Sequence, residues 1–205
     1  MVLLLRRHFK ALSKKKKIIE NYNLTAKFYD KRYKKIQEKK YSIVLSNYQL
    51  KEKRVLDVGC GTGLLIEFIL NSEIFDTASR FYFVAMDISW NMLLEFKLKL
   101  LRCKDNVNIS LILSDIEHLP FRNNIFNVIF SFTSFQNLPG THKGIQELIR
   151  VASIISDLKF SILKKKLKLD TFLDFLKPNV KELEILNEEF LEDIIIQGKI
   201  SKELF

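Results

Sequence analysis

The sequence predicts an α/β fold in which a mostly parallel β-sheet is covered by helices on both faces, with an antiparallel edge strand near the C-terminus and a helical lead-in. Two observations predict it. Short apolar runs alternate with helical patterns from residue 55 onward, which is typical of β-α-β units. The chain has 205 residues, 47% of them hydrophobic, which is enough to bury the core of one compact domain.

The first β-α-β unit begins at a short apolar run. Residues 54–58 end at glycines and predict a strand, and residues 64–70 predict the helix after it. Residues 81–86 predict the second strand. Ser89 is a suitable N-cap for a helix to about residue 101, because apolar side chains then recur along one helical face.

The alternation continues along the rest of the chain. A helix is expected at residues 141–151, and residues 10–50 also have a helical pattern. Further strands are expected, in chain order, at residues 107–113, 126–130, 158–163, 183–186 and 193–196.

The positive charge of the chain is concentrated at its start. Residues 1–54 hold 17 Lys or Arg and four acids, whereas residues 55–205 hold 17 basic and 20 acidic residues. We therefore divide the chain into a basic helical arm and lid at residues 1–50 and a main domain at residues 51–205. The arm suggests RNA or an anionic membrane surface as a partner, although a solvated extension explains it equally well.

The two cysteines give a second compositional clue. Cys60 and Cys103 lack the paired spacing of a metal site, so no metal is expected, and a reducing cytoplasm is favoured.

Three acids follow successive strands, at Asp57, Asp87 and Asp115. In an open parallel sheet the ligand lies at the carboxyl ends of the strands, so three carboxylates there suit a cationic ligand. A nicotinamide dinucleotide fingerprint needs glycine where this chain has Leu64, and the Asp57 carboxylate would repel a pyrophosphate. A Walker-type phosphate loop is excluded, because no lysine follows the glycines.

The glycine-rich segment resembles the first motif of the class I S-adenosylmethionine-dependent methyltransferases, which share a Rossmann-like fold. Within that family the similarity is greatest to the group that includes the quinone-biosynthesis C-methyltransferases, and it covers about residues 25–165. The family motifs match Asp57-Val58-Gly59-Cys60-Gly61-Thr62-Gly63, Ala85-Met86-Asp87-Ile88-Ser89-Trp90-Asn91-Met92-Leu93, Ser114-Asp115-Ile116-Glu117-His118-Leu119-Pro120-Phe121 and Glu147-Leu148-Ile149-Arg150-Val151. The group is indicated by Thr25-Ala26-Lys27-Phe28-Tyr29-Asp30, Ser131-Phe132 and Gln136-Asn137. Residues 152–157 stand where the family has a Pro-Gly-Gly turn.

The resemblance implies a set of cofactor contacts. Asp57 would favour the methionine ammonium, Asp87 would accept both ribose hydroxyls, and Asp115 would accept from the adenine amino group. The remaining cofactor residues would be Gly59, Cys60, Gly61, Thr62 and Gly63 around the methionine and ribose, Ile88, Met92 and Ile116 at the base, and Ser131 and Phe132 beside the methyl group. Tyr29, Tyr33, Gln136 and Asn137 would belong to the lid or the substrate site.

The reaction implied is in-line displacement of the methyl group onto an acceptor that is a small molecule, a quinone-like lipid or RNA. Positioning can supply most of the catalysis, so no catalytic residue is assigned. The lid is expected from residues 25–50, which leaves residues 1–20 no task in cofactor binding. The alternatives are a non-catalytic S-adenosylmethionine-binding partner protein and, more remotely, an NAD-dependent oxidoreductase.

Overall fold

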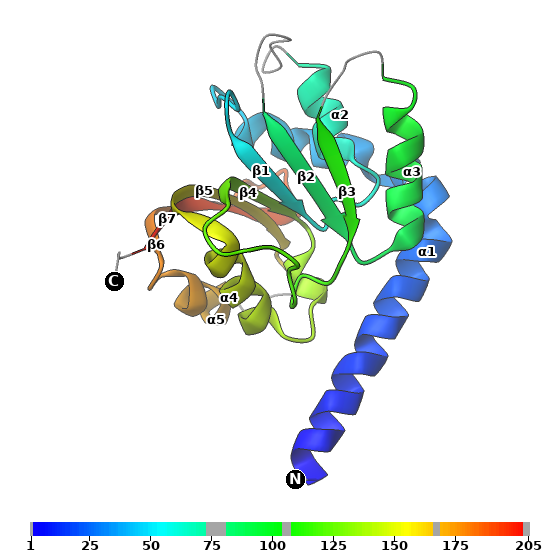
Figure 1. Cartoon of the computed structure of the whole chain (residues 1–205), viewed down its shortest axis with the longest axis vertical. Coiled ribbons are helices and arrows are strands. Elements are labelled where there is room, and N and C mark those ends of the chain that lie inside the picture. The colour runs from blue at the N-terminus through cyan, green and yellow to red at the C-terminus, as the bar shows by residue number, and fades with distance from the viewer. Residues whose placement is uncertain (1, 73–80, 104–107, 166–168, 203–205) are drawn as a thin grey trace.

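The computed structural model describes residues 2–72, 81–103, 108–165 and 169–202 (Figure 1). In these residues seven strands form one sheet in the order β3-β2-β1-β4-β5-β7-β6. The strands β1 to β5 pair in parallel, and β7 pairs antiparallel with both β5 and β6. This confirms the predicted Rossmann-like α/β fold. The strands are β1 (Arg54–Val58), β2 (Tyr82–Asp87), β3 (Ile109–Leu113), β4 (Phe126–Phe132), β5 (Ala152–Leu163), β6 (Val180–Leu186) and β7 (Asp193–Ser201).

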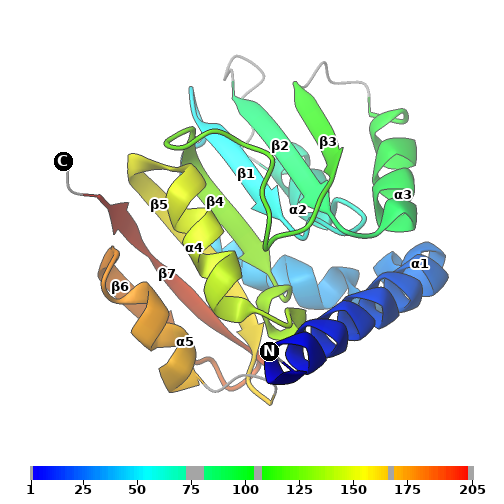
Figure 2. The same ribbon diagram turned by 60° about the horizontal axis from the view of Figure 1, so that its bottom comes forward.

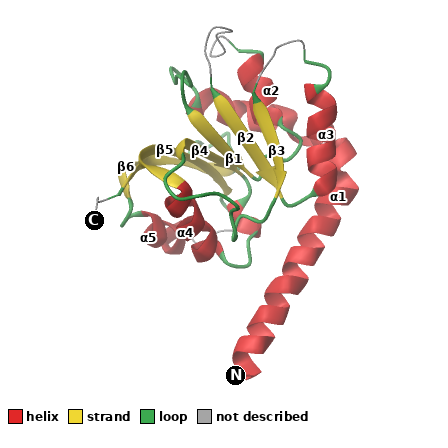
Figure 3. Ribbon diagram, in the orientation of Figure 1, coloured by secondary structure: helices red, strands yellow, loops and turns green. Residues whose placement is uncertain are grey.

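Helices cover both faces of the sheet, as Figure 3 shows. One apolar cluster joins the strands to α4 and α5, and a second joins them to α1, α2 and α3. Each helix therefore buries its apolar side against the sheet. The helices are α1 (Val2–Val44), α2 (Leu64–Leu70), α3 (Trp90–Leu100), α4 (Thr141–Val151) and α5 (Leu169–Leu176), with a short 3₁₀ helix η1 (Phe135–Asn137) after β4.

The centre of the sheet determines where a ligand can bind. Strand β1 lies between β2 and β4, so the chain winds outward from β1 in two directions. Such a switch point leaves a crevice at the carboxyl ends of the strands, which is where open α/β sheets bind ligands.

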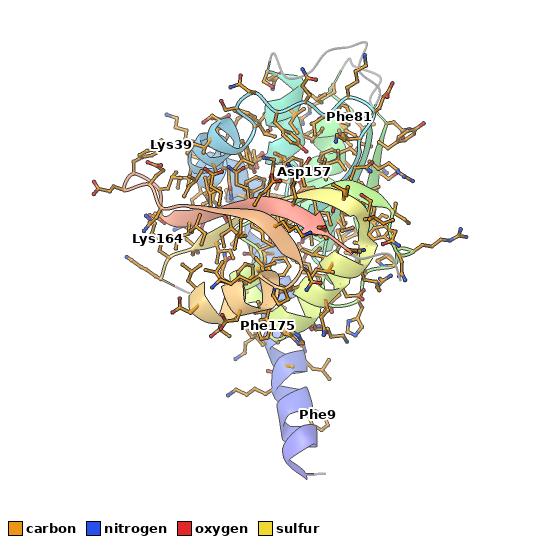
Figure 4. All side chains as sticks on the ribbon, turned by 90° about the vertical axis from the view of Figure 1, so that its left-hand side faces the viewer. Phe9, Lys39, Phe81, Asp157, Lys164 and Phe175 are labelled. Carbon is orange, nitrogen blue, oxygen red and sulfur yellow. The ribbon has the colours of Figure 1, made fainter. Side chains whose placement is uncertain are left out.

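Helix α1 is 43 residues long and has no glycine or proline to interrupt it. Its first turns, with Phe9, project beyond the domain (Figure 4), and the rest lies across the end of the sheet toward which the arrows of β1 and β2 point (Figure 2). No helix among the described residues is long and apolar enough to cross a membrane.

The structure extends β4, β6 and β7 beyond their predicted bounds, and it corrects four further predictions. The N-terminal helix begins at Val2 and ends at Val44, rather than spanning residues 10–50. Strand β5 begins at Ala152 rather than at residue 158, because Ile155 pairs with Ser201 of β7 and so extends the ladder. The helix α5 was not predicted, since its apolar face spans eight residues and depends on packing against the sheet. The third strand begins at Ile109, and its predicted first residue, Val107, lies outside the described residues.

Candidate functional site

The carboxyl end of β1 leads into a turn with three left-handed glycines. Gly59, Gly61 and Gly63 have φ values of 76°, 55° and 80°, which residues with a Cβ rarely adopt. A Cβ added at Gly59 would lie 2.2 Å from the Ser134 hydroxyl oxygen. At Gly61 the nearest atom would be Tyr29 Cε1, at an ordinary van der Waals distance of 3.9 Å, so a side chain there would not clash at once. The turn therefore presents bare backbone to a ligand at Gly61.

Asp87 ends β2 and connects the glycine turn to α3. Its carboxylate accepts hydrogen bonds from the backbone N–H of Gly61 at 2.9 Å and of Ser89 at 2.8 Å. Ser89 is the N-cap of α3, as predicted, and its hydroxyl accepts from the Met92 N–H at 3.2 Å. Because a carboxylate has about four lone-pair positions, Asp87 keeps capacity for further donors such as ribose hydroxyls.

Asp57 and Asp87 form a buried acidic pair. Asp57 is 2% exposed to solvent and Asp87 is 8% exposed. Burial, and then the charge of Asp87, raise the pKa of Asp57 to about 8. Burial also raises the pKa of Asp87, although the N–H groups bound to its carboxylate oppose that rise. The pair therefore favours a ligand that brings positive charge.

Asp115 follows β3 and is held by a lysine of α1. The Lys15 Nζ lies 2.5 Å from Asp115 Oδ2 and also pairs with the Glu117 carboxylate. The other Asp115 oxygen accepts from the Glu117 N–H at 2.9 Å. Burial alone would raise the pKa of Asp115, but the hydrogen bonds from Lys15 and Glu117 outweigh it and lower that pKa. Asp115 is therefore ionised at neutral pH.

The ends of β1, β2 and β3 open into one cavity, here named the main hollow. It contains about 670 Å³ of empty space, part of which is open solvent. Ten of the predicted site residues line it: Gly59, Gly61, Asp87, Ile88, Met92, Asp115, Ile116, Phe132, Tyr29 and Asn137.

Helix α1 closes one side of the main hollow. Lys15, Ile18 and Tyr22 line it, and the Asn137 Nδ2 donates to the Tyr22 hydroxyl at 2.9 Å. We expected residues 1–20 to have no task in cofactor binding, yet Lys15 and Ile18 line the main hollow. The reason is that the first half of α1 lies across the strand ends before the helix changes direction (Figure 2).

A smaller cavity, here named the side hollow, adjoins the glycine turn. Gln37 and Tyr41 of α1 face the buried Asp57 across it. Cys60 also lines it, and burial raises the pKa of its thiol, so this cysteine is a neutral packed group. The side hollow is lined by Tyr29, Gln37, Tyr41, Asp57, Gly59, Cys60, Gly61, Leu64 and Phe132.

Thr133 lies between β4 and the main hollow and is held by a buried ion pair. Its backbone φ of 57° is unusual for a β-branched residue. The Thr133 hydroxyl accepts from Lys40 Nζ at 2.7 Å and donates to Asp193 Oδ2 at 2.9 Å. Lys40 and Asp193 form a salt bridge of 2.8 Å, and both side chains are 1% exposed. This network joins α1 to the start of β7 beneath the site.

Five predicted residues line neither hollow, namely Thr62, Gly63, Ser131, Gln136 and Tyr33. The Thr62 hydroxyl donates to Asp30 of α1, and a Cβ at Gly63 would lie 2.3 Å from the Phe96 ring. The Ser131 hydroxyl donates to the Val58 carbonyl at 2.9 Å. Gln136 Nε2 donates to the Thr133 carbonyl at 2.6 Å, and the Tyr33 ring centroid lies 4.7 Å from that of Tyr29. These contacts hold the five residues behind the walls of the two hollows. A role of any of them in binding a ligand stays a prediction.

Several wall residues escaped sequence reasoning because they come from α1. Lys15, Ile18 and Tyr22 were missed; they are spaced by three and four residues, and the predicted Tyr29 lies seven residues further, which places all four on one helical face. That spacing is the signal that could have found them. Thr133 and Gln37 carry no such pattern. Among the described residues, no group of three or more His, Cys, Asp or Glu could hold a metal ion.

Comparisons with known proteins agree with this geometry. Residues 55–153 match the model of a methyltransferase domain family. An uncharacterized protein of Methanocaldococcus jannaschii is 30% identical over 135 residues, which are 65% of this chain and 47% of that protein. The chain thus spans about half the length of that relative.

Solved structures show the same fold. A putative S-adenosylmethionine-dependent methyltransferase of Methanococcus maripaludis superposes with a TM-score of 0.72 at 16% identity, over 89% of this chain and 94% of that one. The magnesium protoporphyrin IX methyltransferase of Synechocystis, solved with bound S-adenosylmethionine, superposes with a TM-score of 0.71 at 16% identity, over 92% and 97% of the two chains.

Proposed function

This chain carries a class I S-adenosylmethionine-dependent methyltransferase domain with S-adenosylmethionine as its cofactor, and from that premise we propose that it is an active enzyme that methylates a small-molecule acceptor. The observation that carries the proposal is the buried acidic pair of Asp57 and Asp87 beside the bare backbone of Gly61. A ligand with an ammonium and a sulfonium suits this pair, whereas the pyrophosphate of a nicotinamide dinucleotide would be repelled.

The residues of both hollows fit the parts of this cofactor. Asp57 at the side hollow suits the methionine ammonium, and Asp87 suits the ribose hydroxyls. Ile88, Met92 and Ile116 offer apolar surface for the base beside Asp115. The cradle at Gly61 supports the same assignment, because a side chain there would enter the ligand space.

When bound, the cofactor supplies a methyl group on an activated sulfonium. The chain then has to hold the acceptor in line and keep water out. Tyr22 and Tyr29 line the main hollow, and burial raises the pKa of each phenol. Both phenols therefore stay protonated at neutral pH and act as hydrogen-bonding groups, which leaves no role for them as general bases.

The proposal includes a lid role for α1 within residues 1–50, and a cytoplasmic location that the two free thiols, Cys60 and Cys103, support. The main hollow is lined in part by the apolar side chains of Ile18, Phe132 and Leu138. This apolar lining supports a small molecule or a quinone-like lipid over RNA.

The test is methyl transfer from S-adenosylmethionine labelled in its methyl group to a cell extract, followed by separation of RNA, protein, lipid and small molecules. We expect label in the small-molecule or lipid fraction. The Asp87→Ala variant is the matched control, because it should lose transfer through lost cofactor binding.

Three other outcomes would count against the proposal. Label in RNA would identify RNA as the acceptor and the basic arm as the surface that binds it. Cofactor binding by calorimetry without any transfer would favour the non-catalytic partner protein. Binding of NAD in place of S-adenosylmethionine would favour the oxidoreductase.

A further inference from the structure

Gln37 lies in the middle of α1 and is almost completely buried. Its residue is 4% exposed, and its Nε2 lies 3.5 Å from the Thr133 hydroxyl oxygen. Its Oε1 is buried and has no hydrogen-bond partner among the described residues. Buried polar atoms without partners are rare in folded proteins, so such an atom calls for a reason.

The orientation of the Gln37 amide follows from its neighbours. The Thr133 hydroxyl has one proton, and Asp193 Oδ2, an acceptor at 2.9 Å, takes it. The same hydroxyl oxygen accepts from Lys40 Nζ at 2.7 Å. Thr133 can therefore offer Gln37 a lone pair and no proton. The amide nitrogen of Gln37 therefore faces Thr133 and its oxygen faces away from it, while the Gln37 side chain also hydrogen-bonds to the Tyr29 phenol.

The Gln37 side chain lines the side hollow, opposite the glycine turn. Asp57 lines the same space and is 2% exposed, and no cation among the residues that the structure describes opposes the rise of its pKa. The side hollow thus combines two buried groups that accept hydrogen bonds, one neutral and one acidic. A ligand group with several N–H donors and a positive charge satisfies both of them.

We propose that Gln37 is a cofactor-binding residue whose Oε1 accepts a hydrogen bond from the methionine ammonium of S-adenosylmethionine, beside Asp57. An ammonium has three donors and can serve both groups together. The methionine carboxylate suits this position less well, because it has no donor for the Gln37 oxygen and its charge opposes ionisation of Asp57. The inference rests on cofactor binding and needs no methyl transfer. A result against the role of Gln37 would therefore leave the proposed methyl transfer untouched, and the absence of methyl transfer would leave the role of Gln37 untouched.

The test compares two ligands that differ in the methionine part. S-adenosylmethionine has the amino acid group, whereas 5′-methylthioadenosine has the same adenosine and sulfur without it. We expect Gln37→Met to weaken S-adenosylmethionine binding by roughly ten- to a hundredfold, as loss of a hydrogen bond to a charged group does. The affinity for 5′-methylthioadenosine should stay within about twofold of wild type.

Gln136→Met is the matched control. Gln136 also has a buried Oε1 without a partner among the described residues, and its Nε2 also donates to Thr133, yet it lines neither hollow. The ratio of the two affinities should therefore be unchanged in this variant. Equal weakening of both ligands by Gln37→Met, or no weakening of either, would overturn the proposal.

A measurement on the unaltered protein covers the case in which Gln37→Met does not fold. With ¹⁵N-labelled glutamine, the side-chain amide resonances of Gln37 should shift on addition of S-adenosylmethionine and change much less with 5′-methylthioadenosine. Identical shifts with both ligands would overturn the proposal in the same way.

Discussion

The ammonium of Lys15 lies 2.5 Å from the carboxylate of Asp115, although the two residues are 100 positions apart in the sequence. The contact fixes the N-terminal half of α1 over the end of β3, and the Lys15 side chain is 16% exposed. The lysine also pairs with Glu117, so one cation holds two carboxylates that would otherwise repel each other.

Replacing this lysine should loosen the helix locally. In Lys15→Met we expect amide hydrogen exchange in residues 9–22 to rise about tenfold, which corresponds to about 1.4 kcal/mol. Lys16→Met is the control, because Lys16 is 80% exposed and pairs weakly with Glu20 at 3.9 Å. Equal exchange rates in the two variants would show that the Lys15 contact does not hold the helix.

The raised pKa of Asp57 should make stability depend on pH. Between the unfolded pKa of 3.8 and the folded pKa of about 8, the folded chain keeps a proton on Asp57 that the unfolded chain has lost. The free energy of unfolding without cofactor should therefore fall as pH rises through this window, by up to about 1.4 kcal/mol per pH unit from this group. Urea denaturation at pH 5 to 8 measures the slope. The Asp57→Asn variant should lack this contribution, and an identical slope in it would refute the assignment.

The ribose assignment can be tested at Asp87. We expect Asp87→Ala to weaken S-adenosylmethionine binding by roughly ten- to a hundredfold, since charged hydrogen bonds are lost. Because the ribose is also present in 5′-methylthioadenosine, both ligands should weaken equally in calorimetry. The variant should also unfold at lower urea, as Asp87 accepts from the Gly61 and Ser89 N–H groups. Unchanged affinity would rule out the ribose contact.

Gly61 should not tolerate a branched side chain. Its φ of 55° is strained for any residue with a Cβ, and its open side faces the main hollow. We expect Gly61→Val to abolish cofactor binding while circular dichroism still reports a folded chain. A folded Gly61→Val protein with normal affinity would mean that this turn is not the cofactor cradle.

The buried pair of Lys40 and Asp193 should show strong coupling. Lys40→Met leaves the Asp193 carboxylate buried without its cation and should cost about 3–5 kcal/mol of unfolding free energy. The double variant Lys40→Met with Asp193→Leu should cost less than the single one, because no unpaired charge remains. Additive losses in urea denaturation would contradict the coupling.

The sequence predicted the parts of the molecule that local pattern controls. The strand ends at Asp57, Asp87 and Asp115 and the N-cap at Ser89 follow from short apolar runs and turn chemistry, and the structure has them at these positions. The contacts of Lys15, Gln37 and Lys40 could not be predicted in this way. Each joins α1 to a residue many positions away, and the spacing of α1 alone does not say which face of the sheet it meets.

The ion pair between Lys40 and Asp193 links residues 153 positions apart, which has a consequence for how the protein is made. On the ribosome the N-terminal region emerges first, at roughly 5–20 residues per second. The Lys40 ammonium therefore lacks its carboxylate partner until strand β7 has been synthesised. The wall that α1 gives to the site is thus completed only after β7 has emerged, and a nascent chain that stops short of Asp193 leaves that wall without its anchor.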